Sequence, residues 1–294
     1  MLLNGEVWPR NANWRYQGLT ALHTAIAQSL NTCAVRTNLA YGVSNSYDFL
    51  VDKLGFENLT YTDSQQVGNM ALGGFEKGVT TEEMSAAYAA FVNEGVYTKP
   101  RTFIRVEDAN GNVVLENEAQ STVAMKNTTA AIINHLLQEA ALNGTGYEAQ
   151  FSGMHIAGKT GSTNSNKDRY FVGYTPYYSC AVWAGYEHNQ RIVASGNPCS
   201  AVFRKVMSAI HADLADKDFF SCSGLTSVAV CADSGMLASE NCALDVRGSR
   251  VYTALVAADN APTAVCTMHT APTYTVNMAD SDGNVTTVTG SVLN

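Results

Sequence analysis

Five consecutive residues in the middle of the chain combine a cation, hydroxyl groups and a glycine: Lys159, Thr160, Gly161, Ser162 and Thr163. On a β-strand such a set lets a peptide lie alongside as an added strand, because glycine leaves room for a close approach. The Lys159 ammonium would then meet a negative group of that peptide, such as a terminal carboxylate. The alternative interpretation is that Lys159 only keeps an exposed edge strand soluble.

A second string, Ser29-Leu30-Asn31, lies at the end of a predicted helix. Lys-Thr-Gly and Ser-x-Asn strings occur together in serine acyl-transferases of the β-lactamase and penicillin-binding group. The presence of both strings therefore favours acyl-transfer chemistry over the edge-strand interpretation.

Three blocks of the sequence closely resemble the transpeptidase domain of bifunctional (class A) penicillin-binding proteins: residues 16–35, 72–100 and 158–186. The most specific part runs from Lys159 to Pro176, and the resemblance as a whole covers residues 8–270 in the family's order. It implies a D,D-transpeptidase that crosslinks peptidoglycan stem peptides at their D-Ala-D-Ala ends. The reaction would pass through an acyl-enzyme, and β-lactams would acylate the same site.

The same resemblance implies a role for each site residue. Ser29 corresponds to the serine that relays a proton, Asn31 to the side chain that hydrogen-bonds the substrate amide, and Lys159 to the lysine of the third element. The implied substrate-binding residues are Thr160, Gly161, Ser162 and Thr163. Thr160 and Ser162 would hold the terminal carboxylate. The Ser162 backbone N–H would form half of an oxyanion hole, whose donors act on charge that develops in the transition state.

The family's nucleophile, the serine of a Ser-x-x-Lys element, has no counterpart here. No serine of the chain has a lysine three positions later, and the nearest string, Ser165-Asn166-Lys167, has the wrong spacing. We therefore expect a truncated sequence that is inactive alone. The catalytic helix, the first sheet strands, a glycosyltransferase domain and a membrane anchor would precede Met1. A natural pseudoenzyme is the alternative.

The full-length protein is expected at the extracytoplasmic side of the cell envelope, anchored in the membrane. Its expected partners are stem peptides, β-lactams and the cell-wall synthesis machinery. Two other functions stay open on the sequence: a D,D-carboxypeptidase or β-lactamase-like hydrolase, and a non-catalytic module that binds stem peptides. Residues 72–100 and the long tail look unlike small β-lactamases, which favours the transpeptidase.

Composition excludes several other classes of protein. The 294 residues carry 18 Lys and Arg against 26 Asp and Glu, a net charge of −8, and we find no basic patch for a nucleic-acid partner. The longest apolar runs, such as Ala86–Val92, fall far short of the roughly 20 residues of a membrane-spanning helix. No cofactor is expected.

Seven cysteines are unevenly distributed, and three of them, with one histidine, form a possible Cys₃His metal set in the last quarter of the chain: Cys231, Cys242, Cys266 and His269. Only Cys266-x-x-His269 has the closeness typical of metal ligands. A Cys231–Cys242 disulfide is favoured over free thiols, and a metal site is the least expected of the three. We therefore predict no metal.

The elements that must position these residues begin with helices. Apolar spacing predicts one ending near residues 29–31, others over 34–41 and 47–54, and longer ones around 132–140 and 202–214. Thr80-Thr81-Glu82-Glu83 predicts a capping box that starts a helix running to Gly95.

Strand signals then complete the fold prediction. Asn110-Gly111 predicts a small exposed hairpin within residues 101–116, and residues 155–163, 169–175 and 179–187 predict three antiparallel strands. The class is α/β (α+β), a β-lactamase/transpeptidase-like fold with an incomplete antiparallel sheet and a helical subdomain. Residues 1–220 would form this partial domain. Residues 221–294 would form a Cys/Thr-rich, β-rich extension with a hairpin at Asp282-Gly283.

Overall fold

The computed structural model describes residues 2–3, 6–270 and 273–291. The chain divides into two compact units, one made of Met1–Tyr16 and Leu22–Ser223, the other of Gln17–Ala21 and Gly224–Asn294. Each unit is described by itself below. In the described part of the chain, no helix combines the length and the apolar character that crossing a membrane requires.

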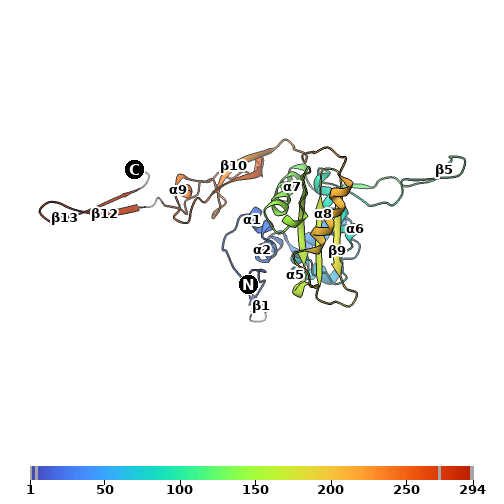
Figure 1. Cartoon of the computed structure of the whole chain (residues 1–294), viewed down its shortest axis with the longest axis horizontal. Coiled ribbons are helices and arrows are strands. Elements are labelled where there is room, and N and C mark those ends of the chain that lie inside the picture. The colour runs from blue at the N-terminus through green and yellow to red at the C-terminus, as the bar shows by residue number, and fades with distance from the viewer. Residues whose placement is uncertain (1, 4–5, 271–272, 292–294) are drawn as a thin grey trace. The chain divides into compact units, whose positions relative to one another are not determined.

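The first unit contains most of the helices and several short strands (Figure 1). Its helices are α1 (Leu22–Ala27), α2 (Asn31–Tyr41), α3 (Val43–Asp48), a π-helical turn (Phe49–Lys53), α4 (Tyr61–Gln65), α5 (Val67–Leu72), α6 (Thr81–Val92), α7 (Asn127–Leu142) and α8 (Pro198–Ile210). Two 3₁₀ turns, Tyr147–Ala149 and Asn164–Asn166, complete them. The short strands are β1 (Leu2–Leu3), β2 (Glu6–Val7), β3 (Val96–Thr98), β4 (Arg105–Glu107), β5 (Val113–Glu116) and β6 (Ser121–Val123).

A three-stranded sheet organises this unit. Its strands are β7 (Ala157–Ser162), β8 (Asp168–Tyr174) and β9 (Ser179–Gly185), in the order β7-β8-β9 with antiparallel pairing throughout. The register places Lys159 opposite Val172 and Gly161 opposite Tyr170. The predicted three strands and the mixed α/β class are therefore confirmed.

Helices pack on both faces of the sheet. Because side chains alternate along a strand, Phe171 and Tyr174 of β8 point to opposite faces. Phe171 lies in a buried cluster with Phe203 and Met207 of α8, and the Phe171 and Phe203 ring centroids are 4.7 Å apart. Tyr174 lies in a second cluster with Leu137 of α7, against which residues of α6 pack. The sheet that carries Lys159 is thus held between two helical layers.

Local signals explain why several of these elements form where they do. At α6, Thr80 accepts a hydrogen bond from the Glu83 N–H, and the Glu83 carboxylate accepts one from the Thr80 N–H, so the predicted capping box is confirmed. At α8, Asn197 caps the helix and Pro198 occupies its first turn, where a missing N–H costs nothing. Both helices therefore have well-defined starts.

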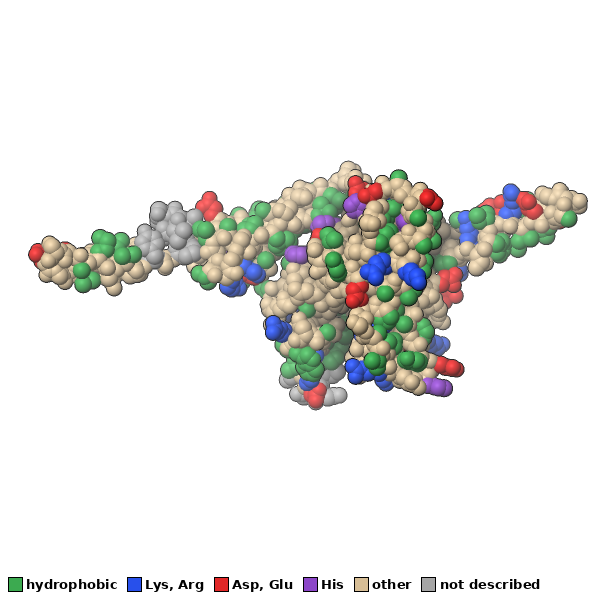
Figure 2. Space-filling model, viewed as in Figure 1, with side chains coloured by type: hydrophobic (Ala, Val, Ile, Leu, Met, Phe, Trp, Pro, Cys, Tyr) green, Lys and Arg blue, Asp and Glu red, His purple; other side chains and the backbone are tan. Residues whose placement is uncertain are grey.

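The predicted exposed hairpin is also confirmed. β4 and β5 pair antiparallel around Asn110-Gly111, and every residue of both strands is exposed. Figure 2 shows apolar side chains along this projecting hairpin. They are Ile104, Val106, Val113, Val114 and Leu115.

Two helix predictions need correction. The second helix starts at Asn31 rather than Ala34, because Leu30 is extended and serves as its N-cap residue. The helix expected over residues 47–54 is instead α3, from Val43 to Asp48, followed by the π-helical turn. In both regions tertiary packing shifts boundaries that apolar spacing alone defines loosely.

The second unit is built from hairpins and one short helix. β10 (Leu225–Cys231) pairs antiparallel with β11 (Val251–Ala257), and between them lies α9 (Glu240–Ala243). A 3₁₀ turn (Ala258–Asn260) follows β11. β12 (Thr273–Ala279) and β13 (Val285–Ser291) then pair around Asp282-Gly283, which confirms the hairpin predicted there.

Candidate active site

Ser29 sits at the end of α1 in a backbone conformation that is rare for its residue type. The Leu30 N–H donates to the Ala25 carbonyl and the Ser29 N–H to the Ile26 carbonyl, the pattern of a Schellman motif. This motif places Ser29 in the left-handed region, with φ of 56°. Glycine is usual at such a position, so the serine here carries backbone strain.

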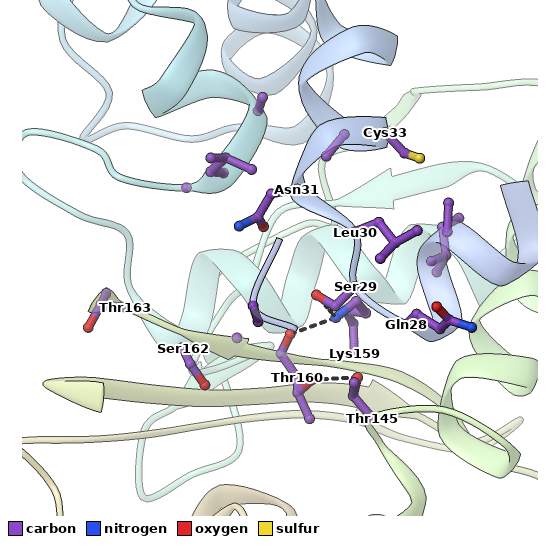
Figure 3. Close-up of a pocket in the computed structure, with 18 of the residues that line it drawn as sticks. Gln28, Ser29, Leu30, Asn31, Cys33, Thr145, Lys159, Thr160, Ser162 and Thr163 are labelled. Atoms are coloured by element: carbon purple, nitrogen blue, oxygen red, sulfur yellow. Dashed lines mark hydrogen bonds between the residues drawn. The ribbon is translucent and has the colours of Figure 1, made fainter. Parts of the chain in front are cut away.

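Lys159 reaches Ser29 across 130 residues of sequence. Its Nζ donates to the Ser29 Oγ at 2.8 Å and to the carbonyl of Thr160 at 3.0 Å (Figure 3). Burial lowers the pKa of Lys159 to about 8. Near neutral pH the lysine is therefore mostly charged, yet it can give up its proton far more readily than a solvated lysine. A serine hydroxyl next to such an amine can pass a proton to it or receive one from it.

Asn31 begins α2, two residues beyond Ser29. Its Nδ2 donates to the Arg10 carbonyl at 2.8 Å. Figure 3 places its side chain on the side of the cleft opposite Thr160 and Ser162. Asn31 and β7 thus border the same space, as the predicted substrate contact requires.

Hydroxyl groups follow Lys159 along β7. The Thr160 Oγ1 donates to the Thr145 Oγ1 at 2.7 Å, and the Ser162 Oγ accepts from Arg169 at 3.1 Å. Thr163 turns instead toward Asp168, whose carboxylate accepts from its hydroxyl at 3.0 Å. Lys159, Thr160, Gly161 and Ser162 therefore lie together along β7, beside the cleft. The Thr163 hydroxyl instead helps to close the turn to β8.

Thr145 is a site residue that the sequence did not single out as such. The loop after α7 packs so tightly on the end of α1 that a Cβ at Gly144 would lie 2.5 Å from the Ala27 carbonyl oxygen. The Thr145 N–H donates to that same carbonyl at 3.1 Å. The sequence offered one signal for this contact, a glycine and a hydroxyl residue, Gly144 and Thr145, just after a predicted helix.

Asn11 is a second residue that sequence reasoning missed. It is buried, and its Oδ1 accepts from both the N–H and the hydroxyl of Thr32 at 3.1 Å. It thereby supplies the acceptor that Leu30, the N-cap residue of α2, lacks. Nothing in the neighbourhood of α2 in the sequence indicates this contact.

These side chains line an open cleft of about 1570 Å³ in the first unit. Ser29, Asn31, Lys159 and the residues 160–163 all border it, which unites every predicted catalytic and substrate-binding residue in one place. β7 pairs with β8 on one edge only, and no described strand pairs with its other edge. An extended peptide could therefore lie along β7 with its end near Lys159.

The four residues of the possible metal set also lie together, in the second unit. Their ligand atoms are all within 4.8 Å of one another, and all four residues are buried. The Cys231–Cys242 disulfide that the sequence favoured is not formed, since all seven cysteines, each in the described part of the chain, are free thiols. The backbone gathers four side chains together rather than pairing two of them.

Comparison with known families now connects these observations. Residues 4–208 match the family described as penicillin binding protein transpeptidase domain, and residues 221–271 match the one described as penicillin-binding protein 1A, C-terminal domain. Penicillin-binding protein 1A of Clostridium perfringens (strain ATCC 13124) is 35% identical over 285 residues, which is 94% of this chain and 34% of that protein. The chain spans about a third of the length of the curated relatives it matches.

Solved structures agree at the level of the fold. The penicillin-binding protein 1A of Haemophilus influenzae gives a TM-score of 0.73 at 20% identity, over 90% of this chain and 44% of that one. PonA1 of Mycobacterium tuberculosis in complex with penicillin V gives 0.63 at 22% identity, over 76% of this chain and 64% of that one. The fold expected from the resemblance is confirmed.

Proposed function

This chain belongs to the penicillin-binding protein transpeptidase family, and we propose that it supplies the Ser-x-Asn and Lys-Thr-Gly parts of a peptidoglycan D,D-transpeptidase site. The observation that carries the proposal is the hydrogen bond from Lys159 to Ser29. It joins the two strings, 130 residues apart, at the edge of one cleft. A lysine of lowered pKa against a serine hydroxyl is what a proton relay needs.

The substrate would be a stem peptide that ends in D-Ala-D-Ala. Its backbone would lie along the open edge of β7, and its terminal carboxylate would meet the Lys159 ammonium and the hydroxyls of Thr160 and Ser162. Asn31 would hold the penultimate amide from across the cleft. The Ser162 N–H would donate to the oxyanion that forms when the D-Ala-D-Ala bond is attacked.

The attacking serine would come from a Ser-x-x-Lys element outside these 294 residues, since no serine here has a lysine three positions later. In the acylation step its Oγ attacks the peptide carbonyl, its proton passes through the relay, and the terminal D-Ala leaves as the amine. A second stem peptide's amine then takes the acyl group, which forms the crosslink and regenerates the serine.

In this proposal residues 1–220 are the transpeptidase part and residues 221–294 a separate extension. The whole protein would act at the outer side of the membrane, in the cell envelope with the wall-synthesis machinery, and β-lactams would acylate it. PonA1 of Mycobacterium tuberculosis, which shares this fold, has been solved in complex with penicillin V, and this supports β-lactam binding here.

A chimera tests the proposal. The transpeptidase-region residues of the C. perfringens relative that precede its matched segment are joined ahead of Met1, and the product is incubated with benzylpenicillin. Intact mass is expected to show one acyl adduct on the chimera and none on this chain alone. Ser29→Ala and Lys159→Ala in the chimera should slow acylation by at least about 100-fold, the typical contribution of proton transfer.

Ser152→Ala is the matched control, since Ser152 is an exposed hydroxyl outside the cleft and its removal should leave the rate unchanged. Unchanged acylation in Ser29→Ala and Lys159→Ala would refute the assigned roles. A stoichiometric adduct on this chain alone would show that a serine within it is the nucleophile, and peptide mapping would begin with Ser29 and Ser162.

A further inference from the structure

The cluster of Cys231, Cys242, Cys266 and His269 is the feature of the second unit that transpeptidation does not use. Cys231 ends β10, Cys242 lies in α9, and Cys266 and His269 follow β11. Their four ligand atoms lie within 4.8 Å of one another. In a tetrahedral site with Zn–S bonds of about 2.3 Å, neighbouring sulfurs are roughly 3.8 Å apart. The side chains therefore need to move by about 1 Å or less to share one ion.

Backbone hydrogen bonds hold the three segments in place around this cluster. The Gly235 N–H donates to the Cys231 carbonyl at 2.8 Å, and the Cys231 N–H to the Met236 carbonyl at 2.8 Å. The Arg250 N–H donates to the Cys242 carbonyl at 2.7 Å, and the Cys266 N–H to the Leu237 carbonyl at 2.8 Å. Backbone hydrogen bonds of its own peptide groups thus fix the position of each cysteine.

Each of the three sulfurs also accepts a backbone N–H. The donors are Asp233 to Cys231, Ser239 to Cys242 and Met268 to Cys266, each at 3.4 Å. Such donors compensate the negative charge that thiolates keep when they bind a metal. Three sulfurs that each accept a backbone N–H fit a common ion better than one disulfide and a spare thiol.

His269 is oriented as a metal-binding histidine would be. Its Nδ1 lies 2.8 Å from the Asp245 carboxylate, which directs Nε2 toward the cluster, 3.2 Å from the Cys231 sulfur. A carboxylate on the far nitrogen is the usual outer partner of a ligating histidine. An Asp233 oxygen lies 3.3 Å from the same Nε2, but two arginines hold that carboxylate, Arg247 and Arg250, each at 2.7 Å.

The second unit has almost no other core. Among its described residues, the buried ones are Val230 and the four members of the cluster. The cysteines are themselves the centre of its apolar cluster, with Ala238 and Val251 packed against them. A small unit with so few buried apolar residues gains little stability from its core, so a metal or a disulfide is the expected staple.

We propose that Cys231, Cys242, Cys266 and His269 bind one Zn²⁺ ion, which holds the second unit folded. Four buried protein ligands close the coordination sphere, so the site is structural and has no open position for a reacting group. The proposal places a metal site first, although the sequence alone ranked it below a disulfide and free thiols. It does not depend on the function of the first unit.

The test uses the whole, untagged chain, purified without chelators or reductants and then exposed to one equivalent of zinc chloride. Elemental analysis is expected to give one zinc per chain. Ellman titration in denaturant with EDTA is expected to find all seven thiols. Cys266→Ser and His269→Ala should lose the zinc, while Cys33→Ser, in α2 of the first unit, should keep it with one thiol fewer.

A cobalt titration covers the case in which those two variants fail to fold. The wild-type chain, reduced and then freed of reductant, should take up one Co²⁺ with the visible bands of tetrahedral thiolate coordination, and zinc should displace it. Five thiols without metal would establish a disulfide and overturn the proposal. Seven thiols without bound zinc, or cobalt without tetrahedral bands, would overturn it equally.

Discussion

Ser29 combines a hydrogen bond to Lys159 with an unfavourable backbone conformation. Its hydroxyl meets Lys159, while its φ of 56° lies where most side chains are strained. A serine here makes sense if the hydroxyl is needed at the cleft, since the local structure alone would favour glycine. In the proposed proton relay, stability and chemistry therefore oppose each other at this one residue.

Substitution of Ser29 separates the two effects. Ser29→Gly and Ser29→Ala both remove the partner of Lys159, but only glycine relieves the backbone strain. We expect Ser29→Gly to exceed Ser29→Ala by about 1 kcal/mol in free energy of unfolding. Urea unfolding in dilute solution, followed by tryptophan fluorescence, measures the first unit, because all three tryptophans lie in it. Equal stabilities would show that Ser29 is not strained.

The lowered pKa of Lys159 predicts that binding of the proposed ligand depends on pH in a defined direction. Burial lowers its pKa to about 8, so the ammonium is complete at pH 6.5 and lost as pH rises through about 8. Binding of a peptide that ends in D-Ala-D-Ala should therefore weaken between pH 7 and pH 9, because its carboxylate loses an ionic partner. Calorimetric titration across this range measures the effect. Lys159→Arg, which stays charged, should flatten the profile, and stronger binding at high pH would contradict the assignment.

At the scale of elements, one buried polar side chain ties α6, α7 and β8 together. Asn134 of α7 donates from Nδ2 to the Phe91 carbonyl in α6 at 3.0 Å. Its Oδ1 accepts from the Tyr174 hydroxyl of β8 at 2.6 Å. Because the Asn134 side chain and Tyr174 are buried away from water, these bonds help to hold α6 and α7 on the sheet that carries Lys159.

Tyr174→Phe should show the cost of breaking this link. It leaves the Asn134 Oδ1 buried without its partner, and we expect a loss of about 1–3 kcal/mol in free energy of unfolding. Tyr147→Phe is the control, since Tyr147 is 67% exposed and should change stability little. The same fluorescence-detected urea unfolding compares both. A Tyr174→Phe variant as stable as the control would mean that the hydrogen bond is not important.

At the scale of the whole molecule, β9 presents an outer edge that no described strand pairs with. Its only strand partner among the described residues is β8. Trp183 of this strand is 44% exposed. Unpaired N–H and C=O groups on such an edge can pair with another copy of the chain.

We accordingly expect the chain to self-associate as its concentration rises and to melt broadly. Sedimentation velocity over a concentration series measures the association. Trp183→Lys places a charge on the edge strand and should reduce it, whereas Val193→Lys adds the same charge at a 90% exposed position outside the strands and should not. A monomer with a sharp cooperative melt would argue against an exposed β9 edge.

Signals that act between near neighbours were enough to predict much of the fold. The Thr80–Glu83 capping box, the Asn110-Gly111 hairpin and the three antiparallel strands all depend on residues a few positions apart, and all are confirmed. The start of α2 was misplaced because its cap comes from Asn11, some twenty residues away. Local patterns cannot report an acceptor that folding brings in from elsewhere.

The sequence by itself therefore determined the family, the mixed α/β class and the strings that carry the proposed chemistry. Only the tertiary structure decided that Ser29 meets Lys159 in a left-handed turn, that Thr145 joins Thr160, and that Cys231, Cys242, Cys266 and His269 converge. The physical reason is that residue type and spacing encode backbone preferences over a few residues. Contacts between distant segments arise only when packing of the helices and strands fixes their separation.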